Sequence, residues 1–226
     1  MSPMNSAPPS LVFTKEPPGK KAQAAMASAD RLASLMMEKT PAHAVDAAVL
    51  VLLSCAGEQR KQHNPVYWKV LLIRRNEYAG IHSGQISFPG GKREENDADL
   101  WETACRETCE EVGIPADHLR KVGALTSIYV PSSNYLIHPF VAVSAIPAAI
   151  RPDPREVVNY KTIPMTVFNP EKATRLDCGC RDGGKRPAPA WRYKGYVIWG
   201  ATAMILSELY HCIREEALTT WARHGI

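Results

Sequence analysis

Apolar positions recur at helical spacing in three parts of the chain and at strand-like spacing in seven others. The helical pattern predicts helices over residues 22–39, which Pro41 ends, and over residues 99–112 and 200–223. Apolar runs rich in β-branched and aromatic residues predict strands at residues 44–54, 66–75, 122–129, 135–145, 157–163, 174–178 and 191–197. Strands mixed with a few helices favour the α+β class, an α/β/α sandwich with a mixed sheet between helices.

Polar and proline-rich segments separate these elements. Five prolines and a Lys20-Lys21 pair predict that residues 1–22 form a disordered leader, which leaves residues 23–226 as one domain. Residues 57–65 and 78–91 are predicted to be loops. The segments 174–178 and 191–197 are predicted to pair as a hairpin.

The composition is that of a soluble globular protein, with 45% hydrophobic and 22% charged residues among 226. No apolar run is long enough for a membrane span and no secretory signal is visible. Six cysteines without a C-x-x-C pair indicate reduced thiols in an intracellular protein. The cytoplasm is therefore the favoured compartment, and a mitochondrion or another organelle remains open.

The predicted helix 99–112 carries the most informative chemistry. Glu107, Glu110 and Glu111 are three and four positions apart, so they project from one face within an arc of about 100°. A separate arc that can pack inward holds Trp101, Ala104, Cys105, Thr108 and Val112. Three converging carboxylates repel one another unless a cation joins them, and oxygen ligands suit Mg²⁺ or Mn²⁺. An isolated acidic helix is more often simply a solvated face.

Charge is distributed unevenly along the chain. Residues 94–111 hold eight acids and one base, which leaves 26 bases against 15 acids elsewhere and a net charge of +4. An acidic site in basic surroundings suits a metal-bridged polyphosphate, although a basic surface alone would give the same balance. The bases are scattered and form no nucleic-acid motif, so neither nucleic acid nor membrane is an expected partner. A homodimer is compatible with the sequence.

The neighbourhood of the glutamates resembles the signature of the Nudix hydrolases. That signature reads Gly, five residues, Glu, seven residues, Arg-Glu, an apolar residue, any residue, Glu-Glu, any residue, Gly and an apolar residue. Its second half matches Arg106-Glu107-Thr108-Cys109-Glu110-Glu111-Val112-Gly113-Ile114, with Thr108 in an apolar slot. In the first half Ala98 stands where Glu is expected, and Gly91 lies one residue too far upstream. A one-residue insertion beside Asp97 or Asp99 accounts for both departures.

The segment before the helix resembles the additional motif of the coenzyme A pyrophosphatase subfamily. Gly84 and Phe88-Pro89-Gly90-Gly91 match that motif, whereas Gly80 stands in place of its second Arg. Three further segments that also resemble this subfamily are residues 129–135, 155–157 and 198–202, so the resemblance covers about residues 44–215.

The resemblance implies a Nudix fold and hydrolysis of a nucleoside diphosphate linked to another moiety. The implied substrate is coenzyme A or an acyl derivative, giving 3′,5′-ADP and 4′-phosphopantetheine. Glu107, Glu110 and Glu111 are the implied ligands of Mg²⁺ or Mn²⁺ and, with Arg106, the catalytic residues. Arg106 could clamp a phosphate, but a salt bridge that orients the carboxylates is favoured.

The candidate substrate-binding residues combine cations, glycines and small polar groups. Glycines let the backbone approach a metal or phosphate closely, and cations could replace the missing Arg. Ser and Asn after Pro131 could line a nucleotide pocket, although such a run also forms turns. These candidates are Arg74, Arg75, His82, Gly90, Gly91, Ser132 and Asn134.

Two other functions remain open at this point. One is hydrolysis of another diphosphate, such as ADP-ribose or a dinucleotide like NADH. The other is a non-catalytic Nudix module that binds a nucleotide or a protein, against which the intact glutamates argue. Aromatic residues near the C-terminus, Trp191, Tyr193 and Trp199, are expected to fill the core rather than stack on a base.

Overall fold

A mixed β-sheet forms the centre of the molecule. The computed structural model describes residues 13, 15–37, 39–55, 67–76, 84–144, 150–179 and 184–224. Strand β1 (Val45–Cys55) runs parallel to β7 (Tyr135–Ser144) and antiparallel to β2 (Trp68–Arg75). The remaining strands of this sheet are β3 (Ile86–Ser87), β4 (Gly90–Lys92), β5 (Leu119–Ala124), β6 (Ile128–Val130) and β8 (Val157–Pro164).

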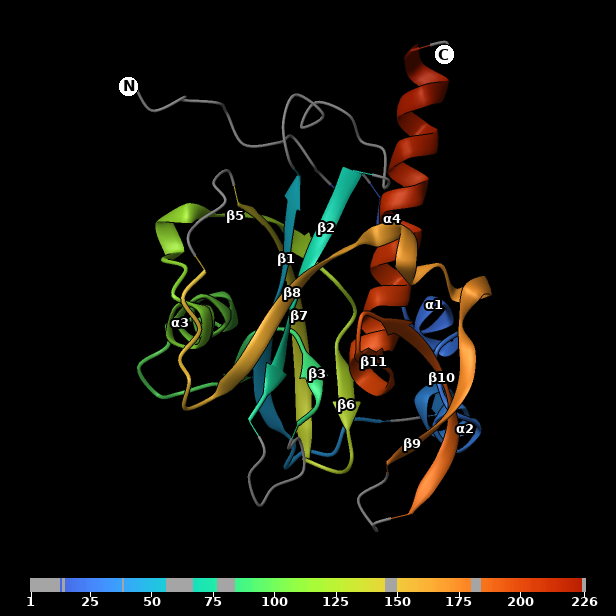
Figure 1. Cartoon of the computed structure of the whole chain (residues 1–226), viewed down its shortest axis with the longest axis horizontal. Helices are drawn as coiled ribbons and strands as arrows, with labels where there is room; N and C mark the ends of the chain where they lie inside the picture. The colour runs from blue at the N-terminus through green and yellow to red at the C-terminus, as the bar shows by residue number, and fades with distance from the viewer. Residues whose placement is uncertain are drawn as a thin grey trace.

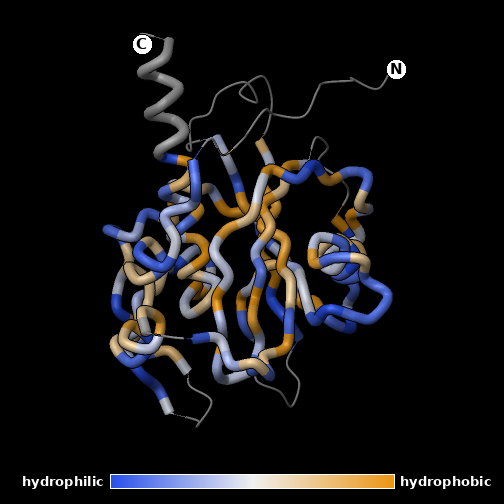
Figure 2. Tube along the Cα trace, turned by 180° about the vertical axis from the view of Figure 1, so that it is seen from behind, coloured by the Kyte–Doolittle hydropathy of each residue, from blue (hydrophilic) through white to orange (hydrophobic). Residues whose placement is uncertain are grey.

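Helices cover both faces of the sheet (Figure 1), as the α/β/α sandwich predicted. Alternate residues of β1 separate the two layers: Ala48, Leu50 and Leu52 pack toward α3 (Leu100–Val112), and Val51 and Leu53 belong to the core beside α4 (Gly200–His224). Figure 2 shows the hydrophobic positions concentrated in the central strands. Because both faces are buried, β1 reads as a continuous apolar run.

Two short helices and a small second sheet pack on the α4 side (Figure 1). Helix α1 (Lys20–Ala24) contacts α4, and α2 (Ala29–Met37) follows it. The second sheet contains β9 (Thr174–Gly179), β10 (Lys185–Tyr193) and β11 (Tyr196–Ile198). Three short 3₁₀ helices complete the described elements, at Ala116–His118, Met165–Phe168 and Pro170–Lys172.

Three predictions about elements are corrected by the structure. The single helix predicted over 22–39 is two helices, because Met26 and Ala27 leave the helical path and enter the core. Residues 20–22 belong to α1 rather than to a disordered leader, since Glu208 of α4 accepts hydrogen bonds from Gly19 N and from Gln23 Nε2. The strand predicted over 122–129 is divided into β5 and β6.

The predicted C-terminal hairpin is also shifted. Strand β9 pairs with residues 185–190 of β10, and the next three residues of β10 pair with β11. Lys194 and Gly195, with φ values of 44° and 85°, make a tight turn between β10 and β11. This turn interrupts the single strand that was predicted over residues 191–197. The predicted loop 57–65 lies outside the described residues. None of the described helices is long and apolar enough to cross a membrane.

Candidate active site

Helix α3 is held at both ends by features of its own sequence. Asp99 caps its start by accepting a hydrogen bond from Glu102 N at 2.8 Å. Gly113 ends it in a left-handed conformation, φ 71°, and donates to Cys109 O. The inward arc packs as predicted, with Ala104, Cys105, Thr108 and Val112 buried. The opposite side of the helix therefore presents the glutamates at fixed positions.

The Gly90-Gly91 pair lies against this helix, where side chains would not fit. Gly90 has φ 149°, and a Cβ there would lie 2.4 Å from Ala48 O. A Cβ on Gly91 would lie 2.4 Å from Oε1 of Glu107. Gly90 N also donates to Glu111 Oε2 at 2.9 Å. The two glycines thus bring strand β4 into direct contact with the carboxylates of α3.

Arg106 joins four acidic groups and holds two of the glutamates. Its Nε and Nη2 donate to Oδ1 and Oδ2 of Asp97 at 2.9 and 3.1 Å. Its Nη1 donates to Glu107 Oε1 at 3.0 Å and to Glu110 Oε2 at 3.2 Å, and lies 3.9 Å from Glu94. Arg106 is therefore placed to orient carboxylates, which is the role that the sequence favoured over clamping a phosphate.

Asp97 is a residue whose role sequence reasoning missed. Its side chain is buried and also accepts hydrogen bonds from Thr103 Oγ1 and Glu94 N. Hydrogen bonds from Arg106 hold the pKa of the Asp97 carboxyl far below its usual range, and the same contact raises the pKa of Arg106. The acidic residues beside Ala98 were the available signal, but the sequence did not distinguish Asp97 from Asp99.

The three glutamates differ strongly in burial. Glu110 is exposed, Glu107 retains 15% of its side-chain accessibility, and Glu111 retains none. Burial raises the pKa of Glu107 and raises that of Glu111 to about 7. Arg75 Nη2 lies 2.8 Å from Oε1 of Glu111, and this buried oxygen accepts no hydrogen bond from any described residue.

The carboxylates around Arg106 and Arg75 supply oxygen donors of the kind that bind a divalent cation. Within the described residues, no three His, Cys, Asp or Glu side chains are already grouped to hold a metal ion. Glu107 and Glu110 nevertheless direct one oxygen each at the same cationic nitrogen of Arg106, and Oε1 of Glu111 is ion-paired with Arg75 but accepts no hydrogen bond from a described residue. Carboxylate oxygens are the donors that Mg²⁺ and Mn²⁺ prefer, so these residues fit such an ion.

A cavity of about 600 Å³ adjoins Glu107 and extends along the α4 side of the sheet. Arg75, Gly90, Gly91, Lys92 and Glu107 line one end of it, and most of the remaining wall is apolar. A volume of this size suits a drug-sized or nucleotide-sized ligand. The cavity and the carboxylates thus meet at strand β4.

The predicted substrate-binding residues separate into two groups. Gly90, Gly91, Arg75 and Ser132 line the cavity. Arg74 and Asn134 do not line it, and His82 falls outside the described residues. Arg74 lies over the Tyr196 ring, 5.8 Å from its centroid. Asn134 supports the turn after β6 instead, since it adopts φ 58° and accepts a hydrogen bond from Tyr129 OH.

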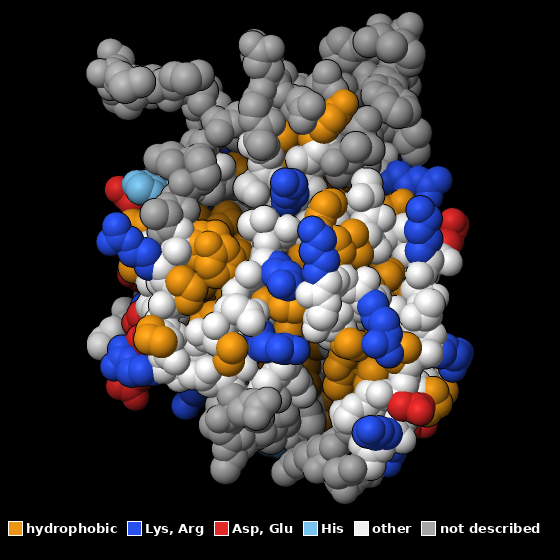
Figure 3. Space-filling view, in the orientation of Figure 1, with side chains coloured by type: hydrophobic (Ala, Val, Ile, Leu, Met, Phe, Trp, Pro, Cys, Tyr) orange, Lys and Arg blue, Asp and Glu red, His pale blue; other side chains and the backbone are white. Residues whose placement is uncertain are grey.

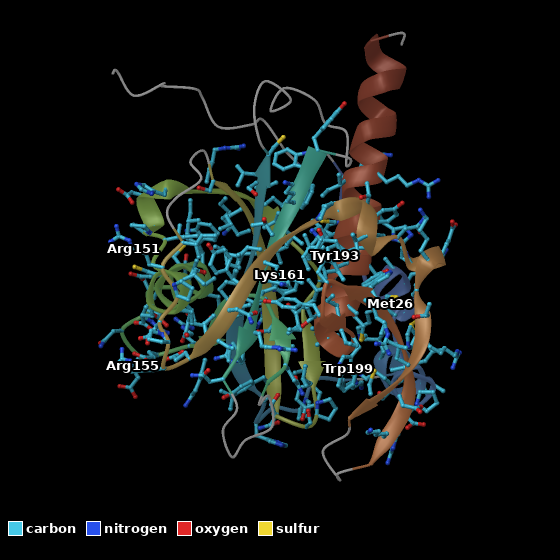
Figure 4. The ribbon with its side chains drawn as sticks, in the orientation of Figure 1. Met26, Arg151, Arg155, Lys161, Tyr193 and Trp199 are labelled. Carbon is cyan, nitrogen blue, oxygen red and sulfur yellow. The ribbon has the colours of Figure 1, made fainter. Side chains whose placement is uncertain are left out.

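Several residues that line the cavity were not among the predicted site residues. Met26, Ser28 and Arg31 belong to the segment containing α1 and α2, and Trp199 and Thr202 lie at or before the start of α4. Figure 4 shows Met26 and Trp199 on the same side of the sheet as α4. Trp199 therefore lines the cavity, whereas Trp191 fills the core as predicted. Helical periodicity alone does not show which buried positions border a cavity.

Comparisons with known proteins agree with this arrangement. The NUDIX domain model matches residues 45–177, more than half of the chain. The uncharacterized Nudix hydrolase NudL of Yersinia enterocolitica is 32% identical over 166 residues, covering 72% of this chain and 78% of the relative. The protein of the same description from Yersinia pestis (strain Pestoides F) is 32% identical over 164 residues, covering 72% and 77%.

Solved structures with a similar fold share little sequence with the chain. The Nudix hydrolase RenU of M. smegmatis is 16% identical with a TM-score of 0.48, covering 78% of this chain and 87% of that one. A C. elegans Ap4A hydrolase is 20% identical with a TM-score of 0.42, covering 53% and 80%. At these values the structures do not bear on the substrate. The domain match and the relatives in Yersinia show that the chain belongs to the Nudix hydrolase family, which confirms the expected Nudix fold and a pyrophosphohydrolase.

Proposed function

We propose that this protein hydrolyses the diphosphate bond of coenzyme A or an acyl-coenzyme A, giving 3′,5′-ADP and 4′-phosphopantetheine. The observation that carries the proposal is a large, mostly apolar cavity whose charged end is formed by Glu107, Arg75 and Lys92 beside Gly90 and Gly91. A diphosphate that joins two large organic groups has the matching distribution of charge and apolar surface. The match of Phe88-Pro89-Gly90-Gly91 to the coenzyme A motif favours this substrate among diphosphates.

The glutamates of α3 are the proposed metal ligands. Nudix hydrolases use divalent metal ions, and Glu107, Glu110 and Glu111 would hold Mg²⁺ or Mn²⁺ here. When bound, such an ion polarises the phosphate, lowers the pKa of the attacking water and neutralises charge on the leaving group. The protein's own part is to position these carboxylates, through Arg106 for Glu107 and Glu110 and through Arg75 and Gly90 for Glu111.

Hydrolysis also requires a group that takes the proton of the attacking water. A glutamate of this set that the metal does not fully engage is the proposed acceptor. Arg75 and Lys92, both on the cavity wall, would bind the phosphate oxygens and oppose their charge. These roles explain why cations and carboxylates occupy the same end of the cavity.

A substrate panel tests the proposal. The protein would be incubated with coenzyme A, ADP-ribose and NADH in Mg²⁺ or Mn²⁺, and the products identified by mass. We expect 3′,5′-ADP and 4′-phosphopantetheine from coenzyme A, at a higher kcat/KM than for the other two. A higher kcat/KM for ADP-ribose or NADH would show that this compound, rather than coenzyme A, is the preferred substrate. Absence of metal-stimulated cleavage across the panel would favour a binding module.

A further inference from the structure

The cavity extends well beyond the glutamates, and its far end is built from a segment outside the matched family domain. Its floor contains a single row of residues across four strands: Lys92 of β4 pairs with Ala47 of β1, which pairs with Ile137 of β7, which pairs with Ile128 of β6. All four residues line the cavity. Three strand spacings separate the ends of the row, a distance of about 14 Å.

Arg31 of α2 lies at the β6 end of this row. Its Nη2 donates to the carbonyl oxygen of Tyr129, the residue after Ile128, and its Nη1 donates to Ser34 Oγ at 3.0 Å. Arg31 itself lines the cavity, as does Ser132 from the turn that follows β6. The ion pair between Asp30 and Arg186, at 2.8 Å, attaches α2 to β10. The guanidinium is thus held beside the β6 end of this row by hydrogen bonds to Tyr129 and Ser34.

The charges of the cavity wall indicate what this second polar end would bind. Among the described residues that line the cavity, the charged ones are three cations, Arg31, Arg75 and Lys92, and one carboxylate, Glu107. Arg75 and Lys92 lie at the glutamate end, and Arg31 is the cation of the opposite end. Arginine pairs well with phosphate oxygens because its donors form a planar fork. The cavity therefore suits a ligand with a second anionic group remote from its diphosphate.

Bond lengths narrow the identity of that group. The floor is about 14 Å long between Cα atoms, so it accommodates a ligand whose two anionic groups are less than about 14 Å apart. A phosphate on the ribose 3′ or 2′ oxygen lies six or seven bonds from the 5′-phosphorus, which corresponds to about 7–8 Å at backbone-like bond geometry. The thiol end of the pantetheine arm, thirteen bonds away, carries no anionic group that would pair with Arg31.

We propose that Arg31 is a specificity-determining residue that recognises a phosphomonoester on the ribose of the substrate. This inference rests on the proposed nucleotide diphosphate substrate and places its nucleoside half, rather than its pantetheine half, along the floor from β4 to β6. The 3′-phosphate of coenzyme A and the 2′-phosphate of NADPH are both phosphomonoesters of this kind. The specificity element then lies on α2, outside the region that the family model matches.

Equilibrium binding tests the inference without catalysis. Affinities of the full chain for 5′-AMP, 3′,5′-ADP and 2′,5′-ADP would be measured in Mg²⁺. We expect one of the two bisphosphates to bind about 10- to 100-fold tighter than 5′-AMP, the ratio typical of a hydrogen-bonded charge pair. A preference for 3′,5′-ADP identifies a coenzyme A-type ligand, and one for 2′,5′-ADP an NADPH-type ligand.

Three variants separate recognition from a structural role. Arg31→Ala should remove most of the preference and leave the affinity for 5′-AMP unchanged, and Arg31→Lys should keep part of it. Arg186→Ala is the matched control, because it removes an equal charge that also contacts α2 but does not line the cavity. It should keep the full preference, because the hydrogen bonds of Arg31 to Tyr129 O and Ser34 Oγ remain. Kinetics with coenzyme A against dephospho-coenzyme A, and with NADPH against NADH, should show the same pattern in kcat/KM.

Two results would overturn the inference. One is equal binding of all three nucleotides by the wild-type protein. The other is equal weakening of all three by Arg31→Ala, which would make Arg31 only a support for α2. If the preference is present but none of the four diphosphates is cleaved, the inference stands and the proposed function fails. If coenzyme A and dephospho-coenzyme A are cleaved equally well and neither bisphosphate binds tighter than 5′-AMP, the proposed function stands and the inference about Arg31 fails.

Discussion

Asp97 controls the site although it lies outside the helix that carries the glutamates. It binds Arg106 through both carboxylate oxygens, and the Nη1 of Arg106 in turn holds Glu107 and Glu110. A buried, paired carboxylate of this kind is costly to disrupt, because its removal leaves the partner's charge uncompensated. The geometry of the glutamates therefore depends on a residue three positions before α3 begins.

Replacement of Asp97 tests this dependence. Asp97→Asn should lower the free energy of unfolding by roughly 3 kcal/mol and reduce kcat, because Arg106 loses its charged partner. Denaturant unfolding and steady-state kinetics measure the two effects. Glu95→Gln, which alters an exposed carboxylate in the same loop, should change stability by less than about 0.5 kcal/mol. Equal behaviour of the two variants would show that the Asp97–Arg106 pair is dispensable.

Glu111 makes stability depend on pH in a defined direction. Burial raises its pKa from 4.5 to about 7, so between these pH values the folded protein holds a proton that the unfolded chain releases. The metal-free protein should therefore lose stability as the pH rises from about 4.5 to 7. Denaturant unfolding in a chelator should show this slope reduced in Glu111→Gln. If the free energy of unfolding of Glu111→Gln falls with pH as steeply as that of the wild type, Glu111 is not the group responsible for the pH dependence.

At the scale of elements, length and periodicity decided what the sequence could predict. Strands β1, β2 and β7 and helices α3 and α4 carry long, regular patterns and were placed within a few residues. Strands β3, β4 and β6 have two or three residues each, too few to show alternation. The break between α1 and α2 was missed because alanines at helical spacing continue across it, although Met26 there is buried by tertiary packing.

The Gly90-Gly91 pair at the start of β4 is the part of the fold whose close contact with Glu107 matters most for activity. Gly91→Ala would place a Cβ 2.4 Å from Glu107 Oε1 and displace that carboxylate, and a shift of about 1 Å can cost 100-fold in rate. We expect a loss of kcat of that order with the fold retained. Gly179→Ala is the control, because no atom lies within 4 Å of its new Cβ. Full activity of Gly91→Ala would refute the close approach.

The whole molecule combines three parts of the chain around one cavity. The core sheet supplies its floor, the α1–α2 segment one wall and the beginning of α4 another. Among the charged side chains on the face seen in Figure 3, Lys and Arg predominate over Asp and Glu, in keeping with the basic charge outside residues 94–111. The carboxylates, the glycines and this charge asymmetry could be predicted from the sequence. The cavity could not, because its walls lie far apart in sequence.

Glu208 connects these parts at the centre of the molecule. It is fully buried on α4 and accepts hydrogen bonds from Gly19 N, Gln23 Nε2 and Thr126 Oγ1. Glu208→Ala should release the α1–α2 wall and lower the free energy of unfolding by roughly 3 kcal/mol, since several donors lose a charged acceptor. Limited proteolysis should then cleave near residue 25 earlier than in the wild type. Unchanged proteolysis would show that α1 is held by packing alone.

The central claim is that the glutamates of α3 form a metal-dependent centre for diphosphate hydrolysis. Its most direct test is the turnover of Glu110→Gln and Glu111→Gln with Mg²⁺ or Mn²⁺, on whichever diphosphate the wild type cleaves best. Circular dichroism would first establish that both variants are folded. The account predicts that both lose orders of magnitude in kcat. Turnover close to that of the wild type in both variants would contradict it.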